Sequence, residues 1–357
     1  MAARGASPPP LTVATPGGAM GEAMRDALFT PFTQQSGIAV KDRTWDGRLG
    51  TLENQARSGT PPDATLLLTD NAVVLAACRE GLLLPLDTTA LPGLGAADGA
   101  RPANGAARSC GLGAVRTGLV LAWDRSRVDG VPNWGDFWDV ARRPGKRGLR
   151  RDPRGTLEIA LMADGVAPGD VYRVLGTADG LDRAFRKLDQ IKPYLVWWNT
   201  PAEAVQLIET GAVLMTSAPN GAVAVADQAG HRDFGVQWRG SLSTLFSWAM
   251  PGTPAANGAA PVPTGNEDAE GRRRTALRLL DFALDPARQA ALLARFPGGG
   301  VLGPTAAANA PETAGGREND DTAVAQHLLR DALKEDDAFW AAHLDAIRGR
   351  FDAWSGS

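Results

Sequence analysis

The sequence is poor in the residue types that most often carry catalysis or bind metals. It contains three histidines and two cysteines among 357 residues. It has no Ser-His-Asp spacing, no phosphate-binding glycine loop of the Walker type and no cluster of metal ligands. We therefore expect a protein that is not an enzyme and that has no cofactor or metal. A cleft enzyme that uses Asp70 and Asp152 as acid and base is the alternative from a different class.

The sequence also lacks long hydrophobic runs and a strong charge bias. No stretch is long and apolar enough to span a bilayer. Residues 1–10 have no apolar signal core, so we expect them to be a disordered N-terminus. If the protein is exported, its signal peptide is absent from this sequence. The formal net charge of -3 offers no general affinity for nucleic acid, so no nucleic-acid partner is expected.

The two cysteines, Cys78 and Cys110, leave two interpretations open. A disulfide between them would stabilise the folded state by about 3 to 4 kcal/mol in the chain-entropy description. Two unrelated buried thiols are the alternative. A metal site is not indicated, because further ligands are missing nearby.

Strand and helix patterns alternate at the start of the chain. Residues 11–15 have strand character, and apolar residues at helical spacing follow until Gly37, which suits a left-handed helix cap. A second strand begins at residue 38, a helix follows over residues 46–59, and another strand and helix occupy residues 61–83. This order predicts an α/β fold with a mostly parallel sheet flanked by helices.

Two apolar strands are expected to connect two halves of the protein. An irregular Gly/Ala-rich stretch over residues 90–114 precedes the first of them, residues 115–124, and residues 243–251 form the second. A chain of 357 residues is long for one core, which favours two lobes with these strands as hinges and a small molecule bound in the cleft. The predicted limits are a disordered N-terminus over 1–10, lobe one over 11–118 plus 245–357 with two C-terminal helices, and lobe two over 119–244.

Several segments in order resemble one family. "SGIAV", "PPDATLLLTD" and "CREGLLLPLD" come first, and "IETGAVLMTSAPNGAVAVADQAG", "STLFSWAMP" and "ALRLLDFALDPARQAALLARF" follow. Over roughly residues 11–310 this pattern is similar to the spermidine/putrescine-type periplasmic binding proteins of ABC importers. The resemblance implies a two-lobed, type II-like periplasmic binding protein. It also implies an exported monomer that delivers a small solute to a membrane permease.

The resemblance carries three ligand-binding positions, and each departs from the family pattern. The family's Trp-Asn-Gly is Pro-Asn220-Gly here, its Trp and Asp on the second crossing strand are Thr244 and Phe246, and its pair of acidic residues is reduced to Asp152. The resemblance implies a polyamine-like amine as the ligand. A polyamine needs carboxylates for its ammonium groups, and most of the family's carboxylates are missing here, so an amino acid or organic anion is the alternative. A ligand sensor on the same scaffold is also open.

The turn after the first strand offers a possible anion site. Gly17 and Gly18 open a helix, so their N–H groups can converge on a carboxylate or phosphate, although tight turns use such glycines for steric reasons alone. Arg116, at the start of the first crossing strand, could pair with the same anion. A salt bridge unrelated to the ligand is its alternative.

Four more residues are predicted ligand contacts because they follow strands. Thr69 and Asp70 stand at the carboxyl end of a strand, where open α/β sheets bind ligands, although Asp70 could instead cap the helix from residue 71. Trp45 could form a cleft wall or anchor the core. Trp198 is predicted to form an aromatic shelf, against the alternative that Trp197 and Trp198 both fill lobe two.

Overall fold

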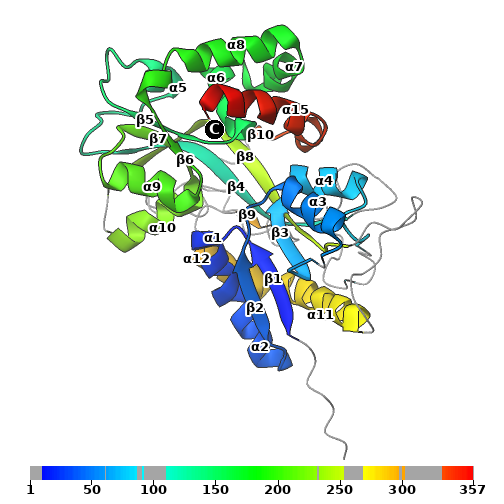
Figure 1. The fold of residues 1–357 in the computed structure, drawn as a ribbon. Coiled ribbons are helices and arrows are strands. Elements are labelled where there is room, and N and C mark those ends of the chain that lie inside the picture. The colour runs from blue at the N-terminus through cyan, green and yellow to red at the C-terminus, as the bar shows by residue number, and fades with distance from the viewer. Residues whose placement is uncertain are drawn as a thin grey trace, which may run out of the picture. The chain divides into compact units, whose positions relative to one another are not determined.

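The chain folds into two compact units that are joined by two long strands. The computed structural model describes residues 10–60, 62–86, 91, 110–230, 233–252, 268–296, 300–301 and 332–356. Unit 1 holds the described residues up to Arg116 and those of Leu245–Arg295, and unit 2 holds those of Thr117–Thr244 together with residues 332–356. Strands β4 (Gly111–Asp124) and β8 (Phe234–Ala249) each have one end in unit 1 and the other in unit 2 (Figure 1).

Part of the predicted sequence pattern lies outside the described residues. This applies to residues 1–9 of the expected N-terminus, to residues 92–109 of the irregular stretch and to the first of the two C-terminal helices. The predicted loop over residues 252–271 lies mostly outside as well, but its last residues are helical, because α11 begins at Asp268.

Neighbouring strands are hydrogen-bonded in the order β2-β1-β3-β8-β4-β7-β5-β6. The parallel group β2-β1-β3 belongs to unit 1, and the parallel group β7-β5-β6 belongs to unit 2.

Unit 1 is built on a short parallel sheet. Strand β1 (Leu11–Thr15) pairs in parallel with both β2 (Val40–Thr44) and β3 (Leu66–Asp70). Strand β3 pairs antiparallel with the unit 1 end of β8. All five residues of β3 are buried, as expected for a strand that is covered on both faces.

The helices of unit 1 form two groups. In one group, the first helical segments pack with the late helices α11 and α12, and in the other α3 packs on α4. The first helix contains a π-helical turn and ends at Gly37, which has the predicted left-handed conformation. The bounds are α1 (Gly18–Met24), η1 (Arg25–Phe29), α2 (Thr30–Ser36), α3 (Leu49–Ser58), α4 (Asn71–Arg79), α11 (Asp268–Ala283) and α12 (Pro286–Arg295).

A disulfide ties two segments of unit 1 together. Cys78 of α4 is bonded to Cys110, which directly precedes β4, and their Cα atoms lie 5.8 Å apart. Of the two interpretations left open by the sequence, the structure therefore has the disulfide. Among the described residues, no helix is long and apolar enough to cross a membrane.

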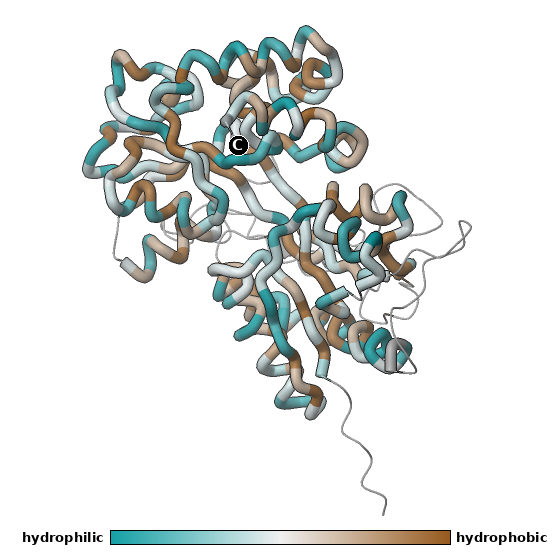
Figure 2. The backbone as a smooth tube through the Cα atoms, viewed as in Figure 1, coloured by the Kyte–Doolittle hydropathy of each residue, from teal (hydrophilic) through white to brown (hydrophobic). Residues whose placement is uncertain are grey.

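Unit 2 has a second parallel sheet. Strand β5 (Arg147–Arg150) lies between β6 (Leu195–Trp198) and β7 (Met215–Pro219) and pairs in parallel with both, while β4 pairs antiparallel with β7. The short strand β10 (Leu333–Lys334) runs parallel to β8, and β9 (Gly300–Val301) pairs with β4. Figure 2 shows hydrophobic residues concentrated along the strands of each unit.

Helices cover the sheet of unit 2. Helix α8 shows how burial follows sequence, because Ala184, Phe185 and Leu188 form its buried face while its acidic and basic residues lie outside. The bounds are α5 (Trp134–Trp138), α6 (Pro153–Ala163), η4 (Pro168–Asp170), α7 (Val171–Leu175), α8 (Ala178–Asp189), η5 (Lys192–Tyr194), α9 (Pro201–Glu209), α10 (Asn220–Gly230) and α15 (Asp337–Ser355).

The C-terminal helix differs from the expectation. We expected the C-terminal helices to complete lobe one, but α15 belongs to unit 2. Its buried residues recur at helical spacing (Trp340, Leu344, Ile347 and Phe351), and its aromatic rings pack on Trp197 and Phe185. The sequence predicts the apolar stripe of this helix, but it does not predict which surface of the protein the stripe covers.

Candidate functional site

Three parallel strands of unit 2 end at one edge of the sheet. Arg150 is the last residue of β5 and is the register partner of Trp198, the last residue of β6. The backbone N–H of Arg151 then donates to the Trp198 carbonyl at 2.9 Å. Strand β7 ends nearby at Pro219 and is followed by Asn220. Carboxyl ends of parallel strands are where open α/β sheets hold their ligands.

The turn from β5 into α6 is fixed by Asp152 and Gly155. Asp152 caps the helix, because its Oδ1 accepts from the Arg154 N–H at 2.9 Å, and Pro153 occupies the first turn, where its missing N–H costs no hydrogen bond. Gly155 has φ of 79°, and a Cβ there would lie 2.6 Å from Leu119 Cδ2, so a side chain is excluded. Regular helix begins at Thr156, whose hydroxyl donates to the Arg150 carbonyl at 2.9 Å.

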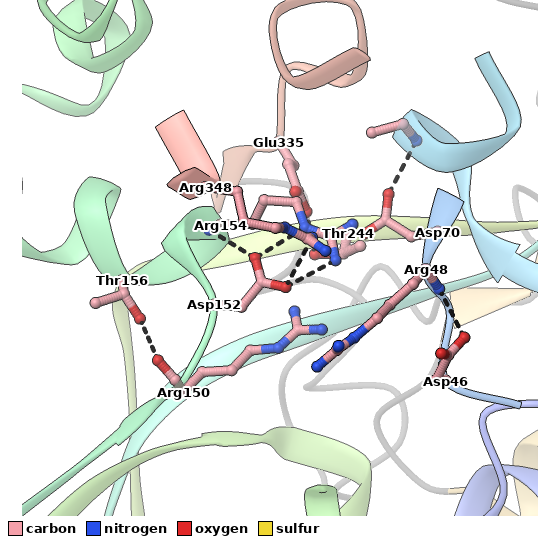
Figure 3. A network of polar contacts seen from close by, with 11 residues as sticks. Asp46, Arg48, Asp70, Arg150, Asp152, Arg154, Thr156, Thr244, Glu335 and Arg348 are labelled. Atoms are coloured by element: carbon pink, nitrogen blue, oxygen red, sulfur yellow. Dashed lines mark hydrogen bonds and ion pairs between the residues drawn. The ribbon is translucent and has the colours of Figure 1, made fainter. Parts of the chain in front are cut away.

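Arginine side chains surround the Asp152 carboxylate (Figure 3). Arg154, which is only 4% exposed, donates from Nε and Nη2 to the two carboxylate oxygens at 3.0 Å each. Arg348 reaches in from α15 and places its Nη2 3.5 Å from Asp152 Oδ2. Burial by itself would raise the pKa of Asp152, but the charges of Arg154, Arg150 and Arg348 outweigh it and hold the pKa well below its usual range. The carboxylate is therefore ionised and committed to arginines.

Arg150 differs from the other two arginines in this group. It is half-buried, and no hydrogen bond or ion pair to its guanidinium is found in the part of the chain that the structure describes. A guanidinium group presents donors that match a carboxylate in a bidentate geometry. We refer to Arg150, Asp152, Arg154 and Arg348 as the arginine cluster.

The other residues predicted for this lobe are engaged in the fold. Trp198 is 2% exposed and its Nε1 donates to Ser217 Oγ at 3.3 Å, so it is not the exposed shelf that we predicted. The amide oxygen of Asn220 accepts from the Thr117 hydroxyl at 3.0 Å and the Gly118 N–H at 2.8 Å. The Thr244 hydroxyl donates to Glu335 Oε2 at 2.6 Å, which holds β8 to the segment that precedes α15.

Unit 1 gathers most of its predicted ligand residues at the carboxyl edge of its own sheet. Thr15 and Thr44 are register partners at the ends of β1 and β2, and the Trp45 N–H donates to the Thr15 carbonyl at 3.0 Å. Gly17 has φ of 72° and comes so close to β2 that a Cβ would lie 2.7 Å from Thr44 Oγ1. Its neighbour Gly18, with φ of 55°, begins α1.

Two of the predicted ligand residues in unit 1 have a buried polar atom without a hydrogen-bond partner among the described residues. These atoms are the indole Nε1 of Trp45 and the hydroxyl of Thr69, the residue before Asp70. Trp45 also lines a pocket of about 280 Å³ together with Leu52 and Gln55 of α3 and Leu67 of β3. Unsatisfied buried polar groups are uncommon, and an ordered water, an ion or a ligand can supply the missing partner. The contacts of Gly17, Gly18, Trp45 and Thr69 with a ligand stay a prediction.

The two charged residues predicted for lobe one have defined positions. Asp70 is buried and caps α4, because its Oδ1 accepts from the Ala72 N–H at 2.9 Å, which is the alternative stated for it. Arg116 lies on β4 and is half-buried. Within the described ranges, no group of three or more His, Cys, Asp or Glu residues is arranged to hold a metal ion.

Sequence reasoning missed three of the four members of the arginine cluster. Arg150 and Arg154 belong to a basic run over residues 142–154, for whose arginines the sequence predicts no ligand contact. Their neighbour Asp152 was the available clue, since a buried carboxylate needs cationic partners. Nothing in the sequence indicated that Arg348 would contact Asp152, because only the folded chain brings α15 to this turn.

Comparisons with known proteins agree with the predicted family. A family model described as bacterial extracellular solute-binding protein matches residues 27–322. The gamma-aminobutyric acid-binding protein of Pseudomonas aeruginosa is 33% identical over 347 residues, which are 97% of this chain and 90% of that protein. The crystal structure of an ABC transporter substrate-binding protein from Bradyrhizobium japonicum USDA 110 is 27% identical, with a TM-score of 0.77 and coverage of 97% of this chain and 99% of the other.

A spermidine/putrescine ABC transporter substrate-binding protein from Streptococcus pneumoniae is a more distant structural neighbour. It is 14% identical, has a TM-score of 0.64 and matches over 97% of this chain and 99% of its own. The predicted α/β fold and the predicted likeness to ABC-importer binding proteins are confirmed, and these relatives are solute-binding proteins rather than enzymes. The chain belongs to the family of bacterial extracellular solute-binding proteins, and it binds a small solute for delivery to an ABC transporter.

Proposed function

We propose that the solute is a small amino acid of the γ-aminobutyric acid type, and that Arg150 binds its carboxylate. The state of the Arg150 guanidinium carries this proposal. It stands half-buried at the carboxyl end of β5, and no hydrogen bond or ion pair to it is found in the described part of the chain. The 33% identity with a gamma-aminobutyric acid-binding protein supports a ligand of this size and charge type.

The arrangement of charges favours a carboxylate over a polyamine. Arg154 and Arg348 are paired with Asp152, so they add positive potential near the ligand but do not need to contact it. Arg150 supplies the hydrogen-bond donors for the ligand carboxylate. A polyamine has no carboxylate for Arg150. Its ammonium groups would also meet an Asp152 carboxylate that is already shared by arginines.

We further propose that the protein acts in the periplasm as a monomer that hands its ligand unchanged to the permease. The Cys78–Cys110 disulfide supports an oxidising compartment. The net charge of -3 supports the absence of a nucleic-acid partner. Incubation with the ligand and recovery of that ligand intact by mass spectrometry would test the claim that no turnover occurs.

Calorimetric titration with three compounds tests the ligand class. γ-Aminobutyric acid carries both charged groups, butyrate carries only the carboxylate and putrescine carries only amines. We expect heat of binding with γ-aminobutyric acid, weaker binding of butyrate and none with putrescine. Binding of putrescine without γ-aminobutyric acid would overturn the proposal in favour of a polyamine ligand.

Adjacent arginines give a matched pair of variants. Arg150→Gln should weaken γ-aminobutyric acid binding by at least about 30-fold, because a charge-assisted bidentate contact is worth about 2 kcal/mol or more. Arg151→Gln removes the same charge from the next residue, which is exposed, and should change the affinity less than about 3-fold. Equal losses in the two variants would reduce the role of Arg150 to general electrostatics.

A further inference from the structure

A buried carboxyl group lies one helical turn beyond the arginine cluster. Glu158 of α6 is 0% exposed, and its Oε1 accepts from the Tyr172 hydroxyl at 2.9 Å and from the Trp340 indole Nε1 at 2.7 Å. Its Oε2 is buried without a hydrogen-bond partner in the described part of the chain. An apolar side chain would fill this space without the free-energy cost of burying a carboxyl group, so a structural or functional role must offset that cost at Glu158.

Helix α15 is attached to α6 at two points. Near its start, Trp340 donates to Glu158, and two turns later Arg348 pairs with Asp152. Because the earlier residue of α15 meets the later residue of α6, the helices run antiparallel along this stretch. On α15 the two contacts are eight residues apart, or about 12 Å of helix. On the other side they involve Glu158 of α6 and Asp152, the residue that caps α6.

The contacts around Trp340 fix the start of α15. Trp340 is fully buried, and the ring of its neighbour Phe339 packs against Tyr172 with centroids 5.4 Å apart. Asp336 caps the helix by accepting from the Phe339 N–H at 2.9 Å. The start of α15 is therefore held by the Trp340–Glu158 hydrogen bond together with the Phe339 ring and the Asp336 cap.

We infer that Glu158 is a positioning residue for the arginine cluster. By accepting the Trp340 N–H it sets the position of α15 along α6, so that Arg348 reaches Asp152 and the other members of the arginine cluster are held beside Arg150. The effect on ligand affinity rests on the proposed function of Arg150, whereas the effect on the position of Arg348 does not. Burial raises the pKa of Glu158 to about 7, although the hydrogen bonds that the carboxyl group accepts, including those from Trp340 and Tyr172, lower it in part.

Within the described residues, Glu158 forms no ion pair with a basic side chain. Tyr172 of α7 and Trp340 of α15 are its hydrogen-bond donors, and burial raises the pKa of Tyr172 well above its usual value, so the phenol stays neutral. The negative charge of Glu335 also raises the pKa of Tyr172. A geometric role through hydrogen bonds is thus more consistent with the site than an ion pair.

The test compares variants that differ in the acceptor or donor of this hydrogen bond. Trp340→Phe removes the indole N–H and keeps an aromatic ring, and Glu158→Ala removes the acceptor. Glu158→Gln keeps the Oε1 acceptor and should restore the wild-type arrangement. Trp134→Phe is the matched control, because Trp134 of α5 also loses one N–H bond, to the Gly240 carbonyl at 2.8 Å, away from α15.

Two measurements follow each variant. Crystal structures give the distance between Arg348 Nη2 and Asp152 Oδ2, which should exceed 3.5 Å in Trp340→Phe and Glu158→Ala but not in Glu158→Gln or Trp134→Phe. Calorimetry should show γ-aminobutyric acid binding weakened by about 5-fold in the same two variants. In an Arg348→Gln background the Trp340→Phe change should have no further effect on affinity, because Trp340 acts on the ligand site only through Arg348.

The outcomes separate this inference from the proposed function. An Arg348–Asp152 distance that is unchanged in Trp340→Phe and Glu158→Ala would overturn the inference, as would independent, additive losses of affinity in the double variant. If the wild type does not bind γ-aminobutyric acid but Arg348 moves in these variants, the proposed ligand is rejected and the positioning role of Glu158 stands.

Discussion

Arg150 and Trp198 are register partners at the ends of two parallel strands, yet they have different environments. The Trp198 ring is 2% exposed and bonded to Ser217, while the Arg150 side chain is half-buried. The last residue of β6 thus supports the sheet, and the last residue of β5 offers a charged group at its edge. On the proposed function, the ligand preference of this edge is set by the Arg150 guanidinium rather than by an aromatic ring.

Replacing Trp198 tests this division of roles. Trp198→Phe should lower the free energy of unfolding by about 1 to 3 kcal/mol, because it removes ring volume and one hydrogen bond from a filled interior. The affinity for γ-aminobutyric acid should stay within about 2-fold of the wild type. Urea unfolding and calorimetry measure the two effects. A large loss of affinity at unchanged stability would instead support the aromatic shelf predicted from the sequence.

Removing the charge of Asp152 should destabilise the protein strongly. Asp152→Asn deprives Arg154, which is 4% exposed, of a carboxylate, and breaking a buried pair in this way costs about 3 kcal/mol or more. Asp170→Asn is the matched control, because Asp170 and Arg173 form an exposed pair that contributes less than about 1 kcal/mol. Urea unfolding of both variants gives the comparison, and equal small losses would contradict a buried ion pair at Asp152.

The raised pKa of Glu158 predicts a pH-dependent stability. Burial raises this pKa from 4.5 to about 7, so the folded protein keeps a proton that the unfolded chain releases. The corresponding contribution is fully present below about pH 4.5 and is lost as the pH rises through 7. The loss amounts to about 3 kcal/mol at most.

Glu158→Gln isolates this contribution. The difference between wild-type and Glu158→Gln unfolding free energies should shift against the wild type between pH 4.5 and 7. Urea unfolding at a series of pH values, followed by tryptophan fluorescence, measures it. Parallel pH profiles for the two proteins would mean that the pKa of Glu158 is not raised in the folded state.

Reduction of the disulfide should weaken unit 1. The bridge between Cys78 and Cys110 closes a segment with a sequence separation of 32 residues. Its loss should cost about 3 to 4 kcal/mol, because the unfolded chain regains conformational freedom. Thermal unfolding with and without dithiothreitol tests this, and a Cys78→Ser, Cys110→Ser variant should match the reduced protein and be insensitive to reductant. A wild-type melting temperature that is unaffected by reductant would contradict the prediction.

Features that depend on neighbouring residues could be predicted from the sequence. Gly37 predicted a left-handed helix end, and Asp152 followed by Pro153 is likewise typical of a capped helix start, because both depend on local backbone geometry. Asp70 shows the limit of such reasoning. A carboxylate after a strand suits both a ligand and a helix cap, and the structure has the cap.

Trp198 could not be placed from strand alternation alone. Alternation assigns Trp197 and Trp198 to opposite faces of β6, but it does not say what covers each face. In the structure the Trp197 ring packs against Phe351 and Trp354 of α15, and Trp198 is buried against Ser217 on β7. Both faces are covered, so neither ring is an open shelf.

The sequence by itself determined the alternating strands and helices, the two crossing strands and the turn that carries Arg150 and Asp152, since each follows from periodicity and local capping. Only the tertiary structure decided that α15 lies on unit 2 and that Trp340 meets Glu158 across 182 positions of the chain. The physical reason is that an apolar helix stripe can be buried on many surfaces with similar gain. Specific partners such as the Glu158 oxygen and the Asp152 carboxylate then select one position, and they become neighbours only in the folded chain.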